Sequence, residues 1–489
     1  MKLTPYMWDL YRESPKGIAA IDEFALAAEE GTEIELLKKY APLQINEMQK
    51  LDLQEYFEVI WCYAIEEHPN DTGPDSLDRA RELYQDIISQ GVRVNGESYI
   101  ERGNYSHVLS LNYVYSILLY YYSPEYFFPN LFVDRFFDLN KIADTFEINL
   151  PPIPKKSDYK ARCMYYWDMC ETLHAFRQEN GLTPPELCAF LYDFAPNFIP
   201  KEKTDIPKPA QAWFIGGLLD SVADSLNFMF WQANKDTKKG DILIHYETSP
   251  VSAITCLWIA QTDGVVDPFF HYYSNAYIGA RIEFPRIALK ELQTDPYFST
   301  HSLVRKKFQG VNGWPVTAED YSELLRMLKA KGFNIDDLPG LHAPSKSQEL
   351  NIRNERDVET ALIDFYLSEV GLMENKDYVR QLGIRAGRGS RVYPDYALHF
   401  DDTPGYERAQ ILIEAKYHMK TNSDVEECFK QARSYANILE SNIIILCDKD
   451  CLMIYKKDNS FDRDRYKKNY WEELKHPDAY NAFKKILNP

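Results

Sequence analysis

Long apolar runs are missing from this sequence of 489 residues. The most apolar segment, Leu109–Tyr122, is short and includes Asn112 and Ser116, so it predicts a buried helix rather than a membrane span or a signal peptide. We therefore expect a cytoplasmic protein with no membrane partner. The chain also lacks a Walker A pattern, GxxxxGK followed by Ser or Thr, so an NTP-driven motor would have to be a separate chain.

Paired cysteines of the zinc-binding type are absent as well. The eight cysteines are scattered, and although Cys447 and Cys451 lie four residues apart, no second pair or histidine cluster follows them. This spacing predicts reduced thiols, most of them in the core, as is usual in a cytosolic protein.

Positive charge is scarce, since 55 Lys and Arg residues stand against 74 Asp and Glu residues and the net charge is −19. A general nucleic-acid coat protein would normally be basic and is not expected. A nuclease is compatible with this charge, because it needs only a local basic track and its metal ligands are acidic. Hydrophobic residues make up 45% of the chain, which indicates a globular protein of roughly two to four domains.

Residues 1–200 are predicted to form a helical domain. Apolar residues recur at intervals of three and four in Ile34–Tyr40 and Leu53–Ile65, and Pro184 stands where the start of a helix tolerates proline. We interpret the aromatic stretch Tyr113–Phe137 as packing between helices, and a base-stacking surface is the alternative.

A segment rich in proline and lysine, residues 197–210, predicts a linker to a middle domain at residues 211–340. Short apolar runs in this domain are bounded by glycine, proline or charge. They predict strands at Ala212–Gly216, Asp241–Tyr246 and Ala253–Ile259.

Residues 350–489 are predicted to form an α/β domain, which makes the whole chain a multidomain α+β protein. The expected elements in chain order are helix Asp357–Val370, strands Arg391–Phe400 and Ala409–Tyr417, helix Val425–Leu439, and strands Asn442–Cys447 and Cys451–Lys456.

The strand with the sequence AQILIEAKY carries the residues that point to chemistry. Alternate side chains of a strand share a face, so Glu414 and Lys416 are neighbours on a strand that is otherwise apolar. A buried charge without a partner is unfavourable, so these two need each other, a metal or a substrate. Asp395 belongs to the preceding strand, and Asp395 with Glu414 would hold Mg²⁺ or Mn²⁺ through carboxylate oxygens. Lys416 would then orient or help deprotonate a water, as phosphodiester hydrolysis requires.

The pair Pro394-Asp395, followed by Glu414-Ala415-Lys416, resembles the PD-(D/E)XK nuclease superfamily, and more narrowly the nuclease domain of type I restriction R subunits. The resemblance spans roughly residues 350–460. It implies a restriction-endonuclease-like α/β core and metal-dependent nuclease activity.

The same resemblance implies three further catalytic residues. An acidic residue is expected on the helix before the strands, where Glu359 fits, and a Gln and a Tyr on the next helix, where Gln431 and Tyr435 fit. Gln431 and Tyr435 are four residues apart and so share one helix face.

Each of these residues also has a purely structural interpretation. Glu414 and Lys416 could form an ordinary charge pair on a solvated face, and Gln431 and Tyr435 a surface pair. Glu359 could simply cap or solvate its helix. The order of all these positions along the predicted elements favours the nuclease.

A loop rich in glycine and arginine leads into the first of these strands. Arg385, Arg388 and Arg391 lie there, close to Arg380, and such guanidinium groups are suited to DNA phosphates. The alternative is a solvated loop.

The middle domain resembles an EVE domain, a small β-barrel of the PUA-like superfamily. The resemblance rests on Trp231 shortly before Lys239-Gly240-Asp241, on the strand Ala253–Ala260, and on the segment Gly313–Leu328. It implies an aromatic pocket for a modified base taken out of the DNA stack, and the alternative is that these rings are core. The candidate pocket residues are Trp231, Tyr246 and Trp258, with Trp314 as a further one.

A reader joined to such a nuclease predicts a modification-dependent, type IV-like restriction endonuclease that acts against foreign DNA. Its partner would be DNA with a modified base, and one nuclease site per chain predicts a homodimer for double-strand cutting. The alternatives are a nuclease for RNA or unmodified DNA, and a non-catalytic nucleic-acid-binding subunit of a defence complex.

Overall fold

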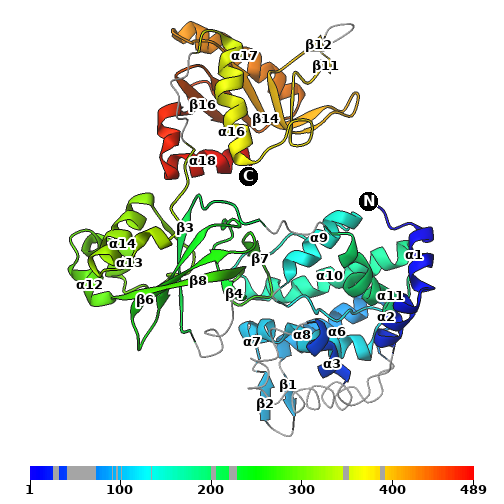
Figure 1. The fold of residues 1–489 in the computed structure, drawn as a ribbon. Coiled ribbons are helices and arrows are strands. Elements are labelled where there is room, and N and C mark those ends of the chain that lie inside the picture. The colour runs from blue at the N-terminus through cyan, green and yellow to red at the C-terminus, as the bar shows by residue number, and fades with distance from the viewer. Residues whose placement is uncertain are drawn as a thin grey trace. The chain divides into compact units, whose positions relative to one another are not determined.

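The computed structural model describes residues 1–25, 32–40, 73–90, 92–94, 97–100, 102–133, 135–199, 205–219, 228–344, 352–385 and 391–488. The chain divides into two compact units (Figure 1). The first unit consists of residues 1–207 and 213–314, and the second of residues 208–212 and 315–489.

The first part of the first unit is helical, as the sequence predicts. Helix α11 begins at Pro184 with a capping box, in which Thr183 and Glu186 bond to each other's backbone N–H groups. The prediction of a helix at Leu53–Ile65 lies outside the described residues. The elements are α1 (Pro5–Arg12), α2 (Pro15–Ala25), α3 (Thr32–Tyr40), α6 (Leu77–Gln90), β1 (Val92–Val94), β2 (Glu97–Ile100), α7 (Tyr105–Ser110), α8 (Asn112–Tyr122), α9 (Phe136–Phe146), α10 (Tyr159–Glu179), α11 (Pro184–Ala189), η1 (Phe190–Phe194) and η2 (Ala195–Asn197).

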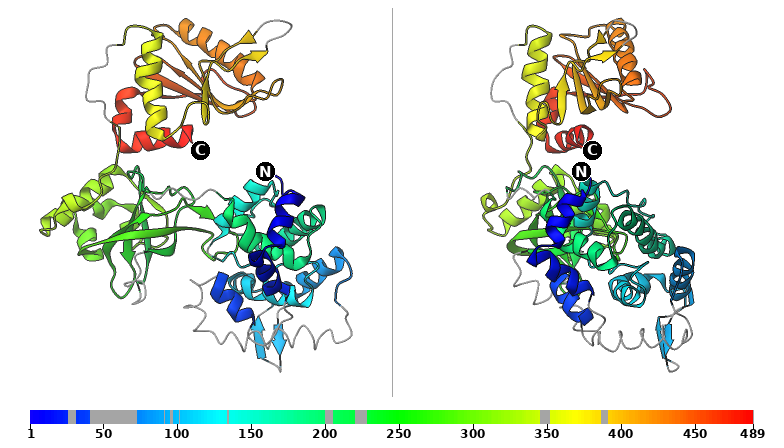
Figure 2. Two further views of the ribbon diagram at one scale, coloured as in Figure 1. Left: turned by 45° about the vertical axis from the view of Figure 1, so that its right-hand side comes forward. Right: turned by 90° about the vertical axis from the view of Figure 1, so that its right-hand side faces the viewer.

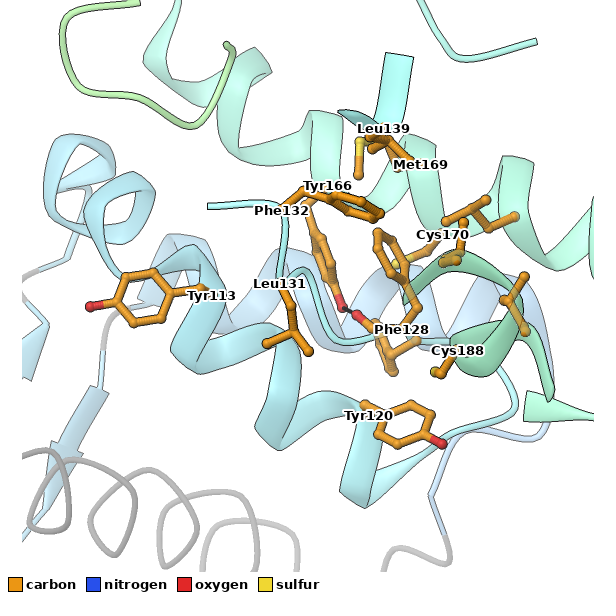
Figure 3. Packing of buried hydrophobic residues seen from close by; sticks show 14 of the residues in the cluster. Tyr113, Tyr120, Phe128, Leu131, Phe132, Leu139, Tyr166, Met169, Cys170 and Cys188 are labelled. Atoms are coloured by element: carbon orange, nitrogen blue, oxygen red, sulfur yellow. Dashed lines mark hydrogen bonds between the residues drawn. The ribbon is translucent and has the colours of Figure 1, made fainter. Parts of the chain in front are cut away.

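The aromatic stretch of this region packs in its core, which confirms the packing interpretation. Figure 3 shows Phe128, Phe132 and Tyr166 gathered between the helices, close to Cys170 and Cys188. The Tyr166 hydroxyl donates to the Phe128 carbonyl at 2.7 Å, so the buried polar end of this ring has a partner. The described cysteines are free thiols and all are buried, as expected. Among the described helices, none combines the length and the apolar character that a membrane crossing requires.

The second part of the first unit is built on a curled sheet (Figure 2). Its strands are β3 (Ala212–Gly217), β4 (Phe228–Gln232), β5 (Ile242–Glu247), β6 (Ala253–Ala260), β7 (Val265–Val266), β8 (Ser274–Ala288) and β9 (Trp314–Val316), in the order β4-β8-β6-β5-β3-β9 with β7 beside β8. The register of β6 against β8 shifts twice, and such bulges bend a strand. The three strands predicted from the sequence are confirmed as β3, β5 and β6. Short helices α12 (Leu289–Thr294), η4 (Phe298–Thr300) and α13 (Ser302–Arg305) follow β8.

Arg162 of α10 joins the helices to the curled sheet within the first unit. It is 0% exposed, and its guanidinium donates to three backbone carbonyls, including those of Pro268 and Phe270 in the loop between β7 and β8. The guanidinium carbon lies 5.1 Å from the centre of the Tyr159 ring and 5.3 Å from that of Tyr273. Every contact of this buried cation therefore comes from the chain itself.

The second unit is a mixed α/β structure with a six-stranded sheet in the order β10-β13-β14-β15-β16-β17. Its strands are β10 (Tyr378–Arg380), β13 (Tyr396–Asp401), β14 (Arg408–Ala415), β15 (Ile443–Cys447), β16 (Cys451–Lys456) and β17 (Lys467–Tyr470), with a separate hairpin of β11 (Ile384–Arg385) and β12 (Arg391–Val392). Its helices are α14 (Ala318–Ala330), η5 (Ile335–Asp337), α15 (Glu355–Val358), η6 (Glu359–Ile363), α16 (Asp364–Val370), α17 (Asn422–Ile438), η7 (Trp471–Lys475) and α18 (Pro477–Leu487). The predicted order of elements is confirmed, and β10, β17 and α18 are additional.

Helices cover both faces of this sheet (Figures 1 and 2). Ile411 and Ile413 of β14 pack with α16 and α18, whereas Leu412 packs with α17 on the opposite face, as the predicted alternation requires. Helix α17 connects β14 to β15, and these two strands are parallel. The prediction of one strand over Arg391–Phe400 is wrong in detail, because β12 ends at Val392 and β13 begins only at Tyr396.

Residues 208–212 belong to the second unit although they lie more than a hundred residues before the rest of it in the sequence. Ala210 is buried in the core that α16 and α18 form with the sheet. The Gln211 side-chain oxygen accepts hydrogen bonds from Asn481 and, at 2.7 Å, from Lys485, both on α18. This segment is thus part of the second unit's packing.

Candidate functional site

Three carboxylates meet at one end of the six-stranded sheet. Glu355 and Glu359 come from the helix α15–η6, and Asp395 from the connection just before β13. One oxygen of each lies within 4.8 Å of one oxygen of the others, so the three could hold a metal ion. Asp395 Oδ2 accepts a hydrogen bond from Ala415 N at 2.8 Å, which ties this carboxylate to the end of β14. Glu359 and Asp395 were candidates from the sequence, whereas Glu355 was missed, although it stands four residues before Glu359.

Glu414 is a fourth carboxylate, and it is 1% exposed. Neither of its buried oxygens has a hydrogen bond of good geometry in the described part of the chain, and the polar groups nearest to them, backbone and side chain, belong to Asp395. Burial, and then the negative charge of Asp395, raise the pKa of Glu414 to about 8, while the charge of Lys416 opposes the shift. Asp395 and Glu414, the predicted ligand pair, are therefore neighbours, and their charges repel.

Lys416 lies one residue beyond the end of β14. Its Nζ donates to the Ala415 carbonyl at 2.7 Å and lies 3.3 Å from Glu355 Oε1. Burial alone would lower the pKa of Lys416, but the negative charges of Glu355 and Asp395 raise it above its ordinary value. The Lys416 ammonium thus lies near Glu355, Asp395 and Glu414, and the charge of Arg380 acts on Glu359. The four carboxyl groups outnumber these two cations, and Glu414, with its raised pKa, is the one that keeps a proton most readily.

Gln431 and Tyr435 share one face of α17, as their spacing predicts. Gln431 Nε2 donates to Tyr435 Oη at 3.1 Å. In the described residues, no hydrogen bond or ion pair links either side chain to the four carboxylates. Cys428, nearly one turn before Gln431, is the α17 residue whose pKa responds to the site: burial raises it to about 12 and the charge of Lys416 opposes this.

The arginines of the predicted phosphate-binding loop are placed differently from one another. Arg385 and Arg391 are both exposed and lie directly opposite each other in the β11–β12 hairpin. Arg388 lies outside the described residues. Arg380 forms an ion pair with Asp364 at 2.6 Å and is part of the second unit's own packing. Like charges opposite each other in a hairpin repel, and the carboxylate of Glu407, whose pKa is lowered by backbone hydrogen bonds and then by both arginines, compensates part of this positive charge.

The aromatic candidates of the curled sheet do not all share one cluster. Trp258 is fully buried in a cluster against which Trp231 packs. Tyr246 lies outside that cluster, with its ring stacked on Phe308 at 3.9 Å between centres. Trp314 has a cation close to its ring, since Lys306 Nζ lies 5.8 Å from the centre.

His245, beside Tyr246 in the sequence, contacts the tryptophan cluster instead. Its ring centre lies 5.2 Å from that of Trp231, and its Nε2 bonds to the Gly217 carbonyl at 3.2 Å. Nδ1 is buried and has no hydrogen-bond partner in the described part of the chain. Burial lowers the pKa of His245 to about 4, so this ring is neutral at pH 7. A histidine in an apolar strand is the one signal by which His245 could have been found from the sequence.

A second group that could hold a metal contains His418, Asp448 and Asp450. Asp448 is buried, and its two oxygens accept hydrogen bonds from the backbone N–H groups of Met419, Asp450 and Cys451. The oxygens of this carboxylate are already used to hold the turn between β15 and β16.

No model of a known protein family matches the chain, and no curated protein matches it. Among solved structures, the chain is similar to the NMR structure of Rpa0253 from Rhodopseudomonas palustris, with 17% identity and a TM-score of 0.21. The match covers 24% of this chain and 94% of that one. A similarity of this extent carries no argument about fold or function.

Proposed function

We propose that this protein is a nuclease that hydrolyses phosphodiester bonds with the help of a divalent cation. The observation that carries the proposal is the side chain of Glu414, which is buried, has no well-formed hydrogen bond in the described part of the chain, and lies beside the second carboxylate, Asp395. Buried carboxylates without partners are unfavourable, so this pair requires either a proton or a cation.

The donor set fits Mg²⁺ or Mn²⁺, because all the groups are hard carboxylate oxygens. Asp395 and Glu414 would hold the ion, and Asp395 also forms a group with Glu355 and Glu359 of the facing helix that could hold a metal. When bound, such an ion polarises the phosphate and lowers the pKa of water. The Lys416 ammonium, which lies beside the same carboxylates, orients the attacking water or a phosphate oxygen.

DNA is the proposed substrate, and the β11–β12 hairpin supports it. The exposed guanidinium groups of Arg385 and Arg391 lie opposite each other, with Glu407 as an acidic neighbour on which both act, so they keep donors for backbone phosphates, which are contacted without regard to sequence. Gln431 and Tyr435 form a further polar pair on α17 that is suited to backbone contacts.

We further propose that the curled sheet selects DNA with a modified base, which makes the protein a type IV-like restriction endonuclease for defence against foreign DNA. Trp231 is the tryptophan of the cluster that keeps partial exposure, and it is the proposed stacking residue. Two copies of the chain would supply the two nuclease sites that double-strand cutting needs.

The test is cleavage, with Mg²⁺, of four matched DNAs: unmodified, cytosine-methylated, hydroxymethylated and glucosylated. The double variant Glu414→Ala/Lys416→Ala is the control for contaminating nuclease. Cutting of a modified DNA only, lost in the control, supports both parts of the proposal. Cutting of all four keeps the nuclease and rejects the reader. Cutting of RNA instead redirects the substrate, and absence of any cutting together with absence of Mn²⁺ binding rejects the nuclease.

A further inference from the structure

The long side chain of Lys416 is held at two points that come from different elements. Its backbone N–H donates to the Cys447 carbonyl of β15 at 2.9 Å, which fixes the Cα position at the end of the sheet. The ammonium is then held by the Ala415 carbonyl from the same strand and by Glu355 Oε1 from α15. A lysine stem has four rotatable methylene groups, so the ammonium keeps one position only while such acceptors hold it.

The position of Glu355 is set by the start of its helix. Asn354 is the N-cap, and its side chain accepts from Asp357 N at 3.0 Å. Val358 is buried under the same turn and anchors it to the core. Glu355 and Glu359 are four residues apart at the start of one continuous helix, which brings both carboxylates to the same end of the sheet.

Within the cluster of four carboxylates, Glu355 and Glu414 differ in how their negative charge is compensated. The side chain of Glu355 is 43% exposed, and it has the Lys416 ammonium as a partner. Glu414 is sealed from solvent and has no well-formed hydrogen bond among the described residues. A cation therefore gains most at Glu414 and Asp395, and the ammonium remains with Glu355.

We propose that Glu355 is a positioning residue for Lys416. Glu355 holds the Lys416 ammonium beside the cluster of four carboxylates, where the ammonium can act on water or phosphate. This inference rests on the proposed nuclease function. It separates two acidic residues of one helix: Glu359 faces the cation, and Glu355 acts through the lysine.

The first experiment is a double-mutant cycle on DNA cleavage with Glu355→Ala and Lys416→Ala. Glu355→Ala alone is expected to lower kcat by about ten- to a hundredfold with KM for DNA changed less than about twofold, as for residues that orient a catalytic group. In the Lys416→Ala background the same change is expected to alter kcat less than about twofold. Glu355→Gln, whose amide oxygen still accepts a hydrogen bond, should recover part of the loss.

Two further measurements need no cleavage activity. Titration with Mn²⁺ is expected to give the same affinity, within about threefold, for the wild type and Glu355→Ala, because on this proposal Glu355 holds the Lys416 ammonium rather than the ion, although its carboxylate lies close enough to Glu359 and Asp395 to be a ligand. Acetylation of Lys416, followed by mass spectrometry, is expected to rise several-fold in Glu355→Ala, because an ammonium released from its ion pair reacts more readily. Glu426→Ala is the matched control: it removes an exposed pair with Lys430 on α17, which raises labelling of Lys430 alone and leaves cleavage unchanged.

Unchanged labelling of Lys416 in Glu355→Ala overturns the proposal. It is also overturned if Glu355→Ala lowers kcat by the same factor in the wild-type and in the Lys416→Ala background. A tenfold or larger loss of Mn²⁺ affinity in Glu355→Ala would make Glu355 a ligand instead. A wild type that cuts no nucleic acid and binds no Mn²⁺ rejects the nuclease itself, and the labelling result still decides whether Glu355 holds Lys416.

Discussion

Arg162 and Glu414 are two ionisable side chains that the chain removes almost completely from solvent, in two different regions. The cation of Arg162 is met by three carbonyl oxygens and two tyrosine rings. The carboxyl group of Glu414 is met by another carboxylate and has no well-formed hydrogen bond in the described chain. Both residues would look alike in a ranking by burial, and only their partners distinguish them.

The difference indicates what each residue is for. A buried charge whose partners are all supplied by the fold stabilises an arrangement, here the joint between helices and curled sheet. A buried carboxyl that the fold leaves without enough opposite charge keeps its proton, as the raised pKa of Glu414 indicates, and the proposed cation would replace that proton.

The largest effect is expected for Asp395→Asn, which removes one charge from the proposed cation site. Cleavage should fall by roughly a thousandfold, the scale seen when a group that acts directly in a reaction is removed. Steady-state cleavage of DNA at fixed Mg²⁺ measures it. The matched control is Asp450→Asn, in the group of His418, Asp448 and Asp450. This variant should cut DNA at the wild-type rate. Equal losses in both variants would mean that the charge of the whole region matters rather than one site.

The direct comparison is between Arg162→Met and Glu414→Gln in urea unfolding without divalent cations. Arg162→Met leaves three carbonyls without a donor and should lower the free energy of unfolding by about 3 kcal/mol. Glu414→Gln removes an unpartnered buried carboxylate and should leave that free energy unchanged or raise it by about 1 kcal/mol.

Adding Mn²⁺ to the same two variants sharpens this result. At about a hundred times its dissociation constant, a bound ion should add about 2.7 kcal/mol to the wild type and to Arg162→Met. Glu414→Gln should gain much less. A destabilised Glu414→Gln that still responds fully to Mn²⁺ would show that Glu414, like Arg162, is structural.

His245 is an intermediate case, since the fold satisfies one of its nitrogens and leaves the other without a partner. Its pKa is lowered from 6.5 to about 4 by burial, with the nearby charge of Arg281 acting in the same direction. The stability that the neutral ring contributes is therefore present above pH 6.5 and is lost as the pH falls from 6.5 towards 4. Between pH 7 and pH 5 the loss should be about 2 kcal/mol.

The measurement is the difference in unfolding free energy between wild type and His245→Gln at these two pH values. Glutamine keeps a donor for the Gly217 carbonyl but does not titrate, so the difference should shift by about 2 kcal/mol in favour of the variant at pH 5. Parallel pH curves would contradict the assignment.

The smallest effects are expected for Arg385→Ala and Arg391→Ala, which lie on the surface. Each should weaken DNA binding several-fold and lower the slope of log affinity against log salt by about 1, because each removes one phosphate contact. Arg326→Ala, which removes an exposed arginine paired with Glu323 on α14, should leave the slope unchanged.

The sequence predicted the parts of the fold that depend on local pattern. The alternation of Ile411, Leu412 and Ile413 identified the two faces of β14, because a strand covered by helices on both sides keeps a period of two. Pro184 marked the start of α11 for an equally local reason. Glu359, Asp395 and Glu414 were assigned to one site from their order, and the structure brings them to one end of the sheet.

The remaining features depend on contacts between distant residues. Glu355 became visible only when the helix end was placed against Lys416, 61 residues later. The sequence pattern of β5 does not show whether His245 or Tyr246 contacts Trp231, because both faces of this strand are buried. Phe308 decides it by stacking on Tyr246, which turns His245 towards the tryptophan.

The segment 208–212 has a consequence for how this protein can be divided or exchanged. Because Ala210 and Gln211 complete the packing of the second unit and precede the strands of the first in the sequence, the second unit is not one continuous segment of the chain. A fragment that begins at residue 315 would lack a buried residue and the partner of Lys485. Recombination that moves the whole second unit must also move the curled sheet, so the second unit and the curled sheet would be inherited together.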